Sequence, residues 1–439
     1  MSDAIDLATL HARTAGGTAI VDCRPLHAYN GWPLAGEPRG GHIPGATAFP
    51  VDWVEQPDGR QLRRSLERLE RGDSGRVVVH GTGRDDARRV ADHLRAVLGH
   101  DAVEVFDEGF GAWAGRPELP VERLVRYEHL VHAGWLRERI EARTVAAVAS
   151  GRPWALFHVQ YSGPEEYLEG HLPGAVHLDT DLLEDPADWD RRRPADLERA
   201  LCALGITRDT TVVLYGRDIE GSPGDRQPGR RAGQIAAARA AAILLWAGVE
   251  DVRLLDGGYD HWVRAGLPIE TDQREPVPVE TFGGALPGNP AVFVDQPDVH
   301  RLLADRDGSV VVSVRSWPEQ TGVTSGYDFV ERKGRIRGDV WGHGGTDAHH
   351  MQHYRNVDNT MRAYPEIART WAAAGITPDK RVAFYCGTGW RASEAWFAAW
   401  LQGWERASIY DGGWLDWSLD PANPIEDGDP DAVDDRDGA

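Results

Sequence analysis

Residues 411–417 read Asp-Gly-Gly-Trp-Leu-Asp-Trp, and two earlier stretches of the chain repeat this pattern. Residues 256–262 read Asp-Gly-Gly-Tyr-Asp-His-Trp, and residues 107–113 read Asp-Glu-Gly-Phe-Gly-Ala-Trp. In each copy the first Asp and the last Trp lie six positions apart, and a short β-branched run precedes the Asp. The pattern predicts a buried strand, a glycine turn and a helix whose tryptophan packs back against the strand. Because it occurs three times, we expect three related structural units.

Two further features recur upstream of each turn, in the same order. An apolar strand followed by an amphipathic helix is expected to begin at residues 77–80, 212–215 and 382–385. Further upstream, glycine turns of the type Gly-His-Ile-Pro-Gly-Ala occupy residues 41–46, 170–175 and, more loosely, 334–339. Apolar strands that alternate with helices imply a parallel sheet covered on both faces. We therefore predict an α/β chain of three tandem domains, each a parallel sheet flanked by helices.

The repeats are spaced as whole domains rather than as short solenoid units. We place linkers at Pro117–Pro120 and at the Pro- and Glu-rich residues 268–278. The expected domains are residues 1–120, 121–272 and 273–425. Residues 426–439 follow as an acidic tail, which we expect to be disordered and to carry no chemistry.

The composition excludes several classes of partner. The chain has 69 acidic and 48 basic side chains, and its formal net charge of -21 disfavours binding to nucleic acid or to anionic membranes. Three widely separated cysteines argue against a disulfide framework and for a reducing compartment. The acidic start lacks the features of a signal peptide, and no apolar stretch approaches the ~20 residues that cross a bilayer. We therefore expect a cytoplasmic protein without nucleic-acid or membrane partners.

The glycine loop at residues 386–391, Cys-Gly-Thr-Gly-Trp-Arg, carries the predicted chemistry. It lies between a strand expected to end at Tyr385 and a helix over residues 392–401. A tight glycine loop at a helix N-terminus directs several backbone N–H groups inward and forms a site for an anion. A Cys386 thiolate held there, or the persulfide anion that it forms, is stabilised by these donors and by the helix dipole. The glycines let the backbone approach the sulfur, and Arg391 is expected to add a positive charge.

The ordered set of motifs is similar to that of a known family. An Asp-x-Arg strand, a Gly-His-Ile-Pro-Gly-Ala turn, a Cys-Gly-x-Gly loop and an Asp-Gly-Gly…Trp turn together resemble the rhodanese family of sulfurtransferases. The resemblance covers nearly the whole chain and leaves out only the acidic tail. The second and third domains resemble the paired inactive and active halves of thiosulfate and 3-mercaptopyruvate sulfurtransferases. The first domain resembles a further, degenerate copy.

The resemblance implies a double displacement. The Cys386 thiolate takes a sulfur from a small-molecule donor, 3-mercaptopyruvate or thiosulfate, and the desulfurated donor leaves. A thiol, cyanide or a sulfur-accepting protein then attacks the terminal sulfur and regenerates the thiolate. The expected catalytic residues are Cys386, Thr388 and Arg391, and the expected substrate-binding residues are Gly387, Gly389, Trp390 and Arg315. This mechanism needs no cofactor and no metal.

The other two domains supply an internal control. The first reads His-Gly-Thr-Gly at residues 80–83, which aligns His80 with the nucleophile. The second reads Tyr-Gly-Arg at residues 215–217, which aligns Gly216 with it. Neither residue can carry a persulfide. We therefore expect sulfur on Cys386 alone, and we expect the first two domains to bury the flank of the third and to wall its cleft.

Two features bear on the sulfur donor. Thiosulfate enzymes of the family typically follow the nucleophile with Arg and Lys, whereas here Gly387 and Thr388 follow it, much like the Gly-Ser pair of the mercaptopyruvate type. Arg315 follows the apolar strand 311–314 and is either an anchor for a substrate carboxylate or a structural arginine bonded to loop carbonyls. The sequence therefore favours 3-mercaptopyruvate over thiosulfate.

A histidine-rich insertion follows the third glycine turn. It contains five potential metal ligands, which are His343, Asp347, His349, His350 and His353. The insertion is open to three interpretations: a lid over the Cys386 loop, a source of a proton donor, or a metal site. We favour the lid, because no further ligand motif joins the histidines and the persulfide chemistry needs no metal.

Two other functions compete with turnover as a sulfurtransferase. One is a persulfide carrier or scaffold that hands sulfur to a biosynthetic partner without turnover. The other is a phosphatase or an arsenate reductase, which share this fold and use a Cys-x5-Arg loop around a tetrahedral oxyanion. The chain has Cys-x4-Arg from Cys386 to Arg391, the length typical of sulfurtransferases.

Overall fold

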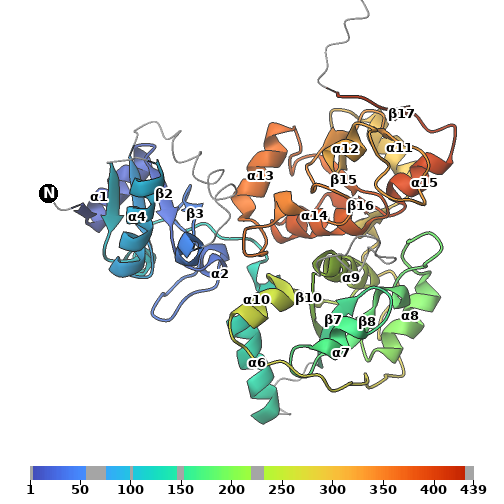
Figure 1. The fold of residues 1–439 in the computed structure, drawn as a ribbon, viewed down its shortest axis with the longest axis horizontal. Helices are drawn as coiled ribbons and strands as arrows, with labels where there is room; N and C mark the ends of the chain where they lie inside the picture. The colour runs from blue at the N-terminus through green and yellow to red at the C-terminus, as the bar shows by residue number, and fades with distance from the viewer. Residues whose placement is uncertain (1–2, 56–75, 99–101, 146–152, 219–231, 431–439) are drawn as a thin grey trace, which may run out of the picture. The chain divides into compact units, whose positions relative to one another are not determined.

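The computed structural model describes residues 3–55, 76–98, 102–145, 153–218 and 232–430 (Figure 1). These residues form two compact units. One unit holds the first sheet together with residues 356–358, and the other holds the second and third sheets. Among the described helices, none combines the length and the apolar character that a membrane crossing requires.

Each domain contains a five-stranded parallel sheet with the same strand order, which confirms the predicted fold. The first sheet runs β1 (Ala4–Ile5), β5 (Val103–Phe106), β4 (Val77–His80), β2 (Ala19–Asp22), β3 (Thr47–Ala48). The second runs β6 (Leu130–Val131), β10 (Asp251–Leu255), β9 (Thr211–Tyr215), β7 (Trp154–Gln160), β8 (Val176–Asp179). The third runs β11 (Phe293–Val294), β16 (Ala407–Tyr410), β15 (Arg381–Tyr385), β12 (Ser309–Ser313), β14 (Val340–Trp341).

Helices flank every sheet. The first domain has α1 (Leu7–Ala15), α2 (Leu26–Asn30), α4 (Arg84–Leu98) and α5 (Phe110–Ala114). The second has α6 (Ala133–Val145), α7 (Glu165–Glu169), α8 (Pro194–Ala203), α9 (Gly233–Ala247) and α10 (Gly258–Arg264). The third has α11 (Gln296–Ala304), α12 (Trp317–Gln320), α13 (Tyr364–Ala373), α14 (Trp390–Leu401) and α15 (Gly413–Leu419). Short 3-10 segments are η1 (Val51–Glu55), η3 (Tyr127–His129), η4 (Thr180–Leu182), η6 (Pro290–Val292) and η7 (Gln352–Tyr354).

The helices α9 and α14 differ from the amphipathic helices that the sequence predicts. Every residue of α9 except Gln234 is buried, and every residue of α14 except Trp400 is buried. The two helices pack against each other, and Figure 1 shows them side by side between the second and third sheets. A helix covered on all sides has no polar face to present to water. The second and third domains therefore share one buried helical layer.

Strand register corrects the alignment of the first domain. In the three sheets Asp22 pairs with His80, His158 with Tyr215, and Ser313 with Tyr385. The backbone agrees, because the turns that follow donate N–H groups to the carbonyls of Gly81, Gly216 and Cys386. Gly81, and not His80, therefore stands at the position of Cys386. The first-domain loop is one residue shorter than the third-domain loop, because α4 begins at Arg84, three residues after Gly81, whereas α14 begins at Trp390, four residues after Cys386. Matching the Gly-Thr-Gly letters of the two loops therefore shifted the alignment by one residue.

The predicted boundaries at residues 120 and 272 stay predictions, whereas the start of the tail differs from the expectation. A small antiparallel pair joins β13 (Arg335–Ile336) to β17 (Ile425–Glu426). The carbonyl of Gly428 also accepts a hydrogen bond of 2.7 Å from Arg335. Residues 426–428 are thus attached to the third domain, because Arg335 supplies a cation for this acidic segment. Residues 431–439 of the predicted tail lie outside the described residues.

Candidate functional site

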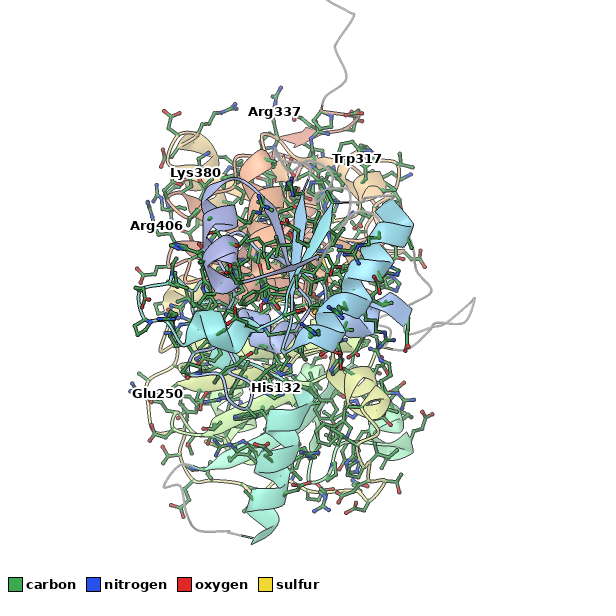
Figure 2. The ribbon with its side chains drawn as sticks, turned by 90° about the vertical axis from the view of Figure 1, so that its left-hand side faces the viewer. His132, Glu250, Trp317, Arg337, Lys380 and Arg406 are labelled. Atoms are coloured by element: carbon green, nitrogen blue, oxygen red, sulfur yellow. The ribbon has the colours of Figure 1, made fainter. Side chains whose placement is uncertain are left out.

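The Cys386 side chain lies at the carboxyl end of β15 and is completely buried. The opposite, amino ends of β15 and β16 are marked by Lys380 and Arg406, at the outer edge of the third domain in Figure 2. Gly389 adopts a left-handed conformation (φ 85°) and caps α14, as a glycine can without strain. The predicted loop, which turns directly into a helix, is therefore present.

The backbone of the loop is fixed from one side and free on the other. The carbonyl of Cys386 accepts a hydrogen bond of 2.8 Å from Trp414 N, and that of Gly387 accepts one of 3.0 Å from Leu415 N. The amides of Gly387, Thr388 and Gly389 donate to no other group of the described residues. These N–H groups are available to an anion bound at the sulfur.

Tyr327 covers the loop, and the sequence motifs did not reveal it. A Cβ atom on Gly387 would lie 2.1 Å from the Tyr327 ring, so only glycine fits there. The Tyr327 hydroxyl donates to the carbonyl of Ala348 over 3.2 Å. Burial raises the pKa of Tyr327, and the neighbouring Cys386 acts in the same direction. Tyr327 therefore lies within electrostatic reach of the sulfur, in an irregular segment that carries no recognisable pattern.

Arg391 is buried beside the loop, but its charge is already paired. Its guanidinium forms two hydrogen bonds with Glu319, of 2.7 and 2.9 Å, and a third of 3.1 Å with the carbonyl of Asp347. Although burial opposes ionisation, Arg391 lowers the pKa of Glu319 to about 2. Arg391 thus holds a fixed positive charge beside the loop that Glu319 neutralises, and its catalytic role stays a prediction. Arg391 ties the loop to α12, where Ser316 and Glu319 form a capping box.

Arg315 is held by groups of its own domain. Its side chain is fully buried, its Nη2 donates to the carbonyl of Gly334 over 2.8 Å, and its Nε donates to Ser313 Oγ over 3.3 Å. Arg24 in the first domain bonds to Gly41 and Asp22 in the same way, and its Nη1 also donates to Glu37. Arg315 Nη1 has no hydrogen-bond partner among the described residues. The bonds to Gly334 and Ser313 favour the structural alternative, and the role of an anchor for a substrate carboxylate stays a prediction.

Aromatic side chains from two domains gather at the loop. Tyr161 and Trp189 come from the second domain, and Phe329 and Trp390 from the third; we call these four the aromatic cluster. Trp390 meets Tyr161 with ring centroids 5.9 Å apart and Trp189 at 6.1 Å, in both cases edge to face. Trp189 also stacks on Phe329 at 6.2 Å. Phe329 is 52% exposed, so the cluster opens to solvent.

Carboxylates surround this cluster. Burial and then the charges of Asp181, Asp179 and Glu184 raise the pKa of Tyr161. Burial raises the pKa of Glu184 itself to about 8, and the Trp390 indole is among its neighbours. The ring faces attract a cation, and Asp179 and Asp181 add negative charge near Tyr161, whereas Glu184 is paired with Arg239. The sequence concealed this arrangement, because its members are spread over more than 200 positions of two domains.

The histidine-rich insertion is attached to the loop by the bonds from Arg391 to Asp347 and from Tyr327 to Ala348. His349 meets the Tyr327 ring edge to face at 5.8 Å, and His350 pairs with Asp347 at 2.7 Å. Among the described residues, no set of three His, Cys, Asp or Glu side chains is arranged to hold a metal ion. The insertion therefore contacts the residues beside Cys386, as a lid would, and the lid remains an interpretation.

The equivalent positions of the other domains are closed. A Cβ atom on Gly216 would lie 1.8 Å from the carbonyl oxygen of Gly233, and one on Gly81 would lie 2.6 Å from Cys23 Sγ. Cys23 is itself buried, and burial raises the pKa of its thiol. A neutral, buried thiol is a poor nucleophile.

A family model described as the rhodanese-like domain matches residues 6–116, 133–265 and 295–420. Among curated proteins, the thiosulfate sulfurtransferase YnjE of Escherichia coli is 37% identical over 409 residues, which is 93% of this chain and 88% of that protein. Among solved structures, wild-type EanB matches with a TM-score of 0.92 and 41% identity, over 98% of this chain and 99% of that chain.

Other matching structures add ligands. The anaerobic ergothioneine biosynthesis enzyme from Chlorobium limicola, in complex with its natural substrate trimethyl histidine, has a TM-score of 0.92 and 41% identity, over 98% of this chain and 100% of that chain. One EanB structure carries a cysteine persulfide in a tetrahedral intermediate state with ergothioneine. EanB variants change a cysteine, a threonine two residues later, and a tyrosine as far before that cysteine as Tyr327 lies before Cys386. In this chain Thr388 follows Cys386 by the same two residues.

Proposed function

The chain belongs to the rhodanese-like family and is a sulfurtransferase, and from this premise we propose that it moves sulfur through a Cys386 persulfide to the imidazole ring of a trimethylated histidine. The sulfur donor and this acceptor are its small-molecule partners. The free backbone amides of the loop support the persulfide anion.

The aromatic cluster is the observation that carries the choice of acceptor. A trimethylammonium group has no hydrogen-bond donor, so it is recognised by the faces of aromatic rings and by a negative potential. The cluster supplies Tyr161, Trp189, Phe329 and Trp390, and the negative charges of Asp179 and Asp181 lie near Tyr161. A small acceptor such as cyanide would need none of these rings.

The proposed step balances without an oxidant. The imidazole carbon between the two ring nitrogens forms a bond to the terminal sulfur of the persulfide, and the proton that it loses ends on a ring nitrogen of the thione product. The S–S bond breaks, and its electron pair remains on the Cys386 thiolate. The terminal sulfur is reduced and the carbon is oxidised, so no other redox partner enters. Thr388 lies two residues after Cys386, and Tyr327 covers the loop at Gly387, so we assign their hydroxyls to the ring nitrogens of the acceptor.

The charges around the loop bear on the donor. The positive charge of Arg391 is neutralised by Glu319, and Arg315 already donates to Gly334 and Ser313, so we assign neither to the donor. Without Arg315 as an anchor, the preference for 3-mercaptopyruvate rests on Gly387 and Thr388 alone. We propose a persulfide or a hydrogen polysulfide monoanion as the donor, because its terminal sulfur carries a single charge that the loop amides can bind.

Thiosulfate sulfurtransferase activity is the second candidate, and the similarity to YnjE over 93% of the chain favours it. A single-turnover experiment separates the two. The protein is treated with polysulfide, freed of excess reagent and mixed with trimethylhistidine, with unmethylated histidine or with cyanide. We expect trimethylhistidine to gain about 32 Da, one sulfur, as the Cys386 peptide loses it. Unmethylated histidine should react at least about 10-fold more slowly, since it lacks the cation–π contacts. Transfer to cyanide but not to trimethylhistidine would favour the second candidate.

A further inference from the structure

A buried arginine of the second domain, which lacks the nucleophile, contacts the Cys386 loop. Arg239 lies on α9 and is completely buried. Its Nη1 lies 2.7 Å from Asp411 Oδ1, and its Nε donates to Glu184 Oε2 over 2.9 Å. The same Nη1 would lie 2.9 Å from a Cβ atom on Gly389, so the guanidinium touches the end of the loop.

Asp411 connects this arginine to the sulfur. It opens the third Asp-Gly-Gly turn, whose Trp414 N–H donates to the carbonyl of Cys386 over 2.8 Å. The second carboxylate oxygen of Asp411 accepts from Arg191 of the second domain, at 3.1 Å from the amide and 2.5 Å from Nη1. Two arginines of the second domain therefore orient the turn that fixes the backbone of the nucleophile.

Arg239 also holds Trp189 of the aromatic cluster. Trp189 has a φ of 66°, in the left-handed region where a bulky aromatic residue is rarely found. Its carbonyl accepts a hydrogen bond of 2.9 Å from Arg239 Nη2, and its amide donates to Asp185 O over 2.7 Å. A strained residue persists where its surroundings fix it, and such strain is concentrated at functional sites. Here the strained backbone directs the indole toward Trp390 and Phe329.

The second domain has an arrangement equivalent to the Arg239 pair, but with the charges reversed. Glu394 on α14 pairs with Arg355 at 2.7 Å, and Asp256 of the second Asp-Gly-Gly turn accepts from Met361 N over 2.7 Å. The Asp256 turn donates the Tyr259 N–H to the carbonyl of Gly216, which has no nucleophile. Glu394 and Arg239 are thus equivalent buried ion-pair partners, but only Arg239 adjoins Cys386.

We propose that Arg239 is a positioning residue of the sulfur-transfer site, which orients Trp189 and the Asp411 turn so that the aromatic cluster closes over Cys386 and receives the acceptor. The identity of that acceptor rests on the proposed function, whereas the closure over Cys386 does not. Arg239 contacts neither the sulfur nor the acceptor and acts through the groups that it holds. The role explains why a domain without a nucleophile is needed by the one that has it.

The test compares Arg239→Gln with Arg239→Lys and with the matched control Glu394→Gln. In Arg239→Gln we expect alkylation of Cys386 by iodoacetamide to accelerate at least about 10-fold, since the closed cluster protects it. The KM for trimethylhistidine should rise by a similar factor while polysulfide still adds one sulfur to Cys386. Arg239→Lys should restore part of both effects, and Glu394→Gln should change neither, although it also breaks a buried pair.

The outcomes separate the two proposals. Alkylation that is faster in Arg239→Gln but not in Glu394→Gln supports the positioning role, whichever acceptor the protein uses. If the wild-type protein does not convert trimethylhistidine, only the proposed acceptor is refuted. Alkylation unchanged in Arg239→Gln, or accelerated equally by Glu394→Gln, overturns the positioning role. Should Arg239→Gln fail to fold, Trp189→Gly replaces it, because glycine accepts the positive φ without strain. That variant should keep its melting temperature and show the same acceleration, and an unchanged alkylation rate would again overturn the proposal.

Discussion

Replacing Arg391 with methionine should destabilise the unit that contains the third domain by an amount set by its partner. Arg391 and Glu319 are both buried, and the variant leaves the Glu319 carboxylate without its two guanidinium hydrogen bonds. Breaking one side of a buried ion pair costs about 3–5 kcal/mol. At about 1.5–2 °C per kcal/mol for a unit of about 300 residues, the melting temperature should fall by roughly 4–10 °C. Differential scanning calorimetry measures this directly.

The double variant Arg391→Met with Glu319→Gln tests the cause. The glutamine oxygen can still accept the 2.6 Å hydrogen bond from Ser316 Oγ, while no charge remains buried. We therefore expect the double variant to recover at least about half of the lost stability, because the main cost is the orphaned charge. It should also accept sulfur on Cys386, since the persulfide depends on backbone amides. A double variant as unstable as Arg391→Met would refute the reasoning. Loss of sulfur loading in the double variant would show that the charge of Arg391 is needed for catalysis.

Four further results are expected. Cys386→Ser should abolish sulfur loading, and peptide mapping of the wild-type protein should find no sulfur on Cys23, whose pKa is raised by burial. Glu319 and Asp22 have folded pKa values of about 2, below their unfolded values, so their contribution to stability in urea should be constant above about pH 4.5 and be lost between about pH 4.5 and 2; it should amount to about 3 kcal/mol for Glu319 and about 2 kcal/mol for Asp22, and the difference between the wild-type protein and Glu319→Gln across the pH series measures the Glu319 part. Gly216→Cys should load no sulfur and should lower the melting temperature, as the added Cβ meets the Gly233 carbonyl, and a second loaded cysteine in its mass spectrum would contradict this. Dialysis against a strong chelator should leave transfer rates unchanged, whereas a stoichiometric metal lost together with activity would favour the histidine-rich insertion as a metal site.

The fold could be predicted because its determinants are local and repeated. Each copy encodes a strand, a glycine turn and a packed tryptophan within a few residues, and the order is the same in all three copies. The position of Cys386 could be predicted for the same reason, since a glycine loop between a strand and a helix is a short-range pattern. The alignment of His80 failed because the letters Gly-Thr-Gly were matched without knowing where β4 ends.

The partners of charged and aromatic groups could not be predicted in this way. The sequence shows that Arg315 and Arg391 are cations, but not that Gly334 and Glu319 already occupy them. Tyr327 lies in an irregular segment whose contact with Gly387 arises only when the chain is folded. Trp189 reaches Trp390 because α9 and α14 pack together, a contact between domains that no local pattern encodes. Of the residues to which we assign the acceptor, the sequence therefore predicted Trp390 and Thr388 but missed Tyr327, Tyr161, Trp189 and Phe329.

The relation between the second and third domains shows what the loss of a nucleophile did and did not change. Gly216 is enclosed by the backbone at the start of α9, so the second site has been filled by its own helix rather than left open. That same helix carries Arg239 to the third site, and each Asp-Gly-Gly aspartate accepts an N–H from the other domain. A domain held in this reciprocal way cannot be removed without releasing the turn that fixes Cys386. Its retention thus follows from the support that it gives to the neighbouring site, and this support requires α9 and the strained residue 189 rather than a second cysteine.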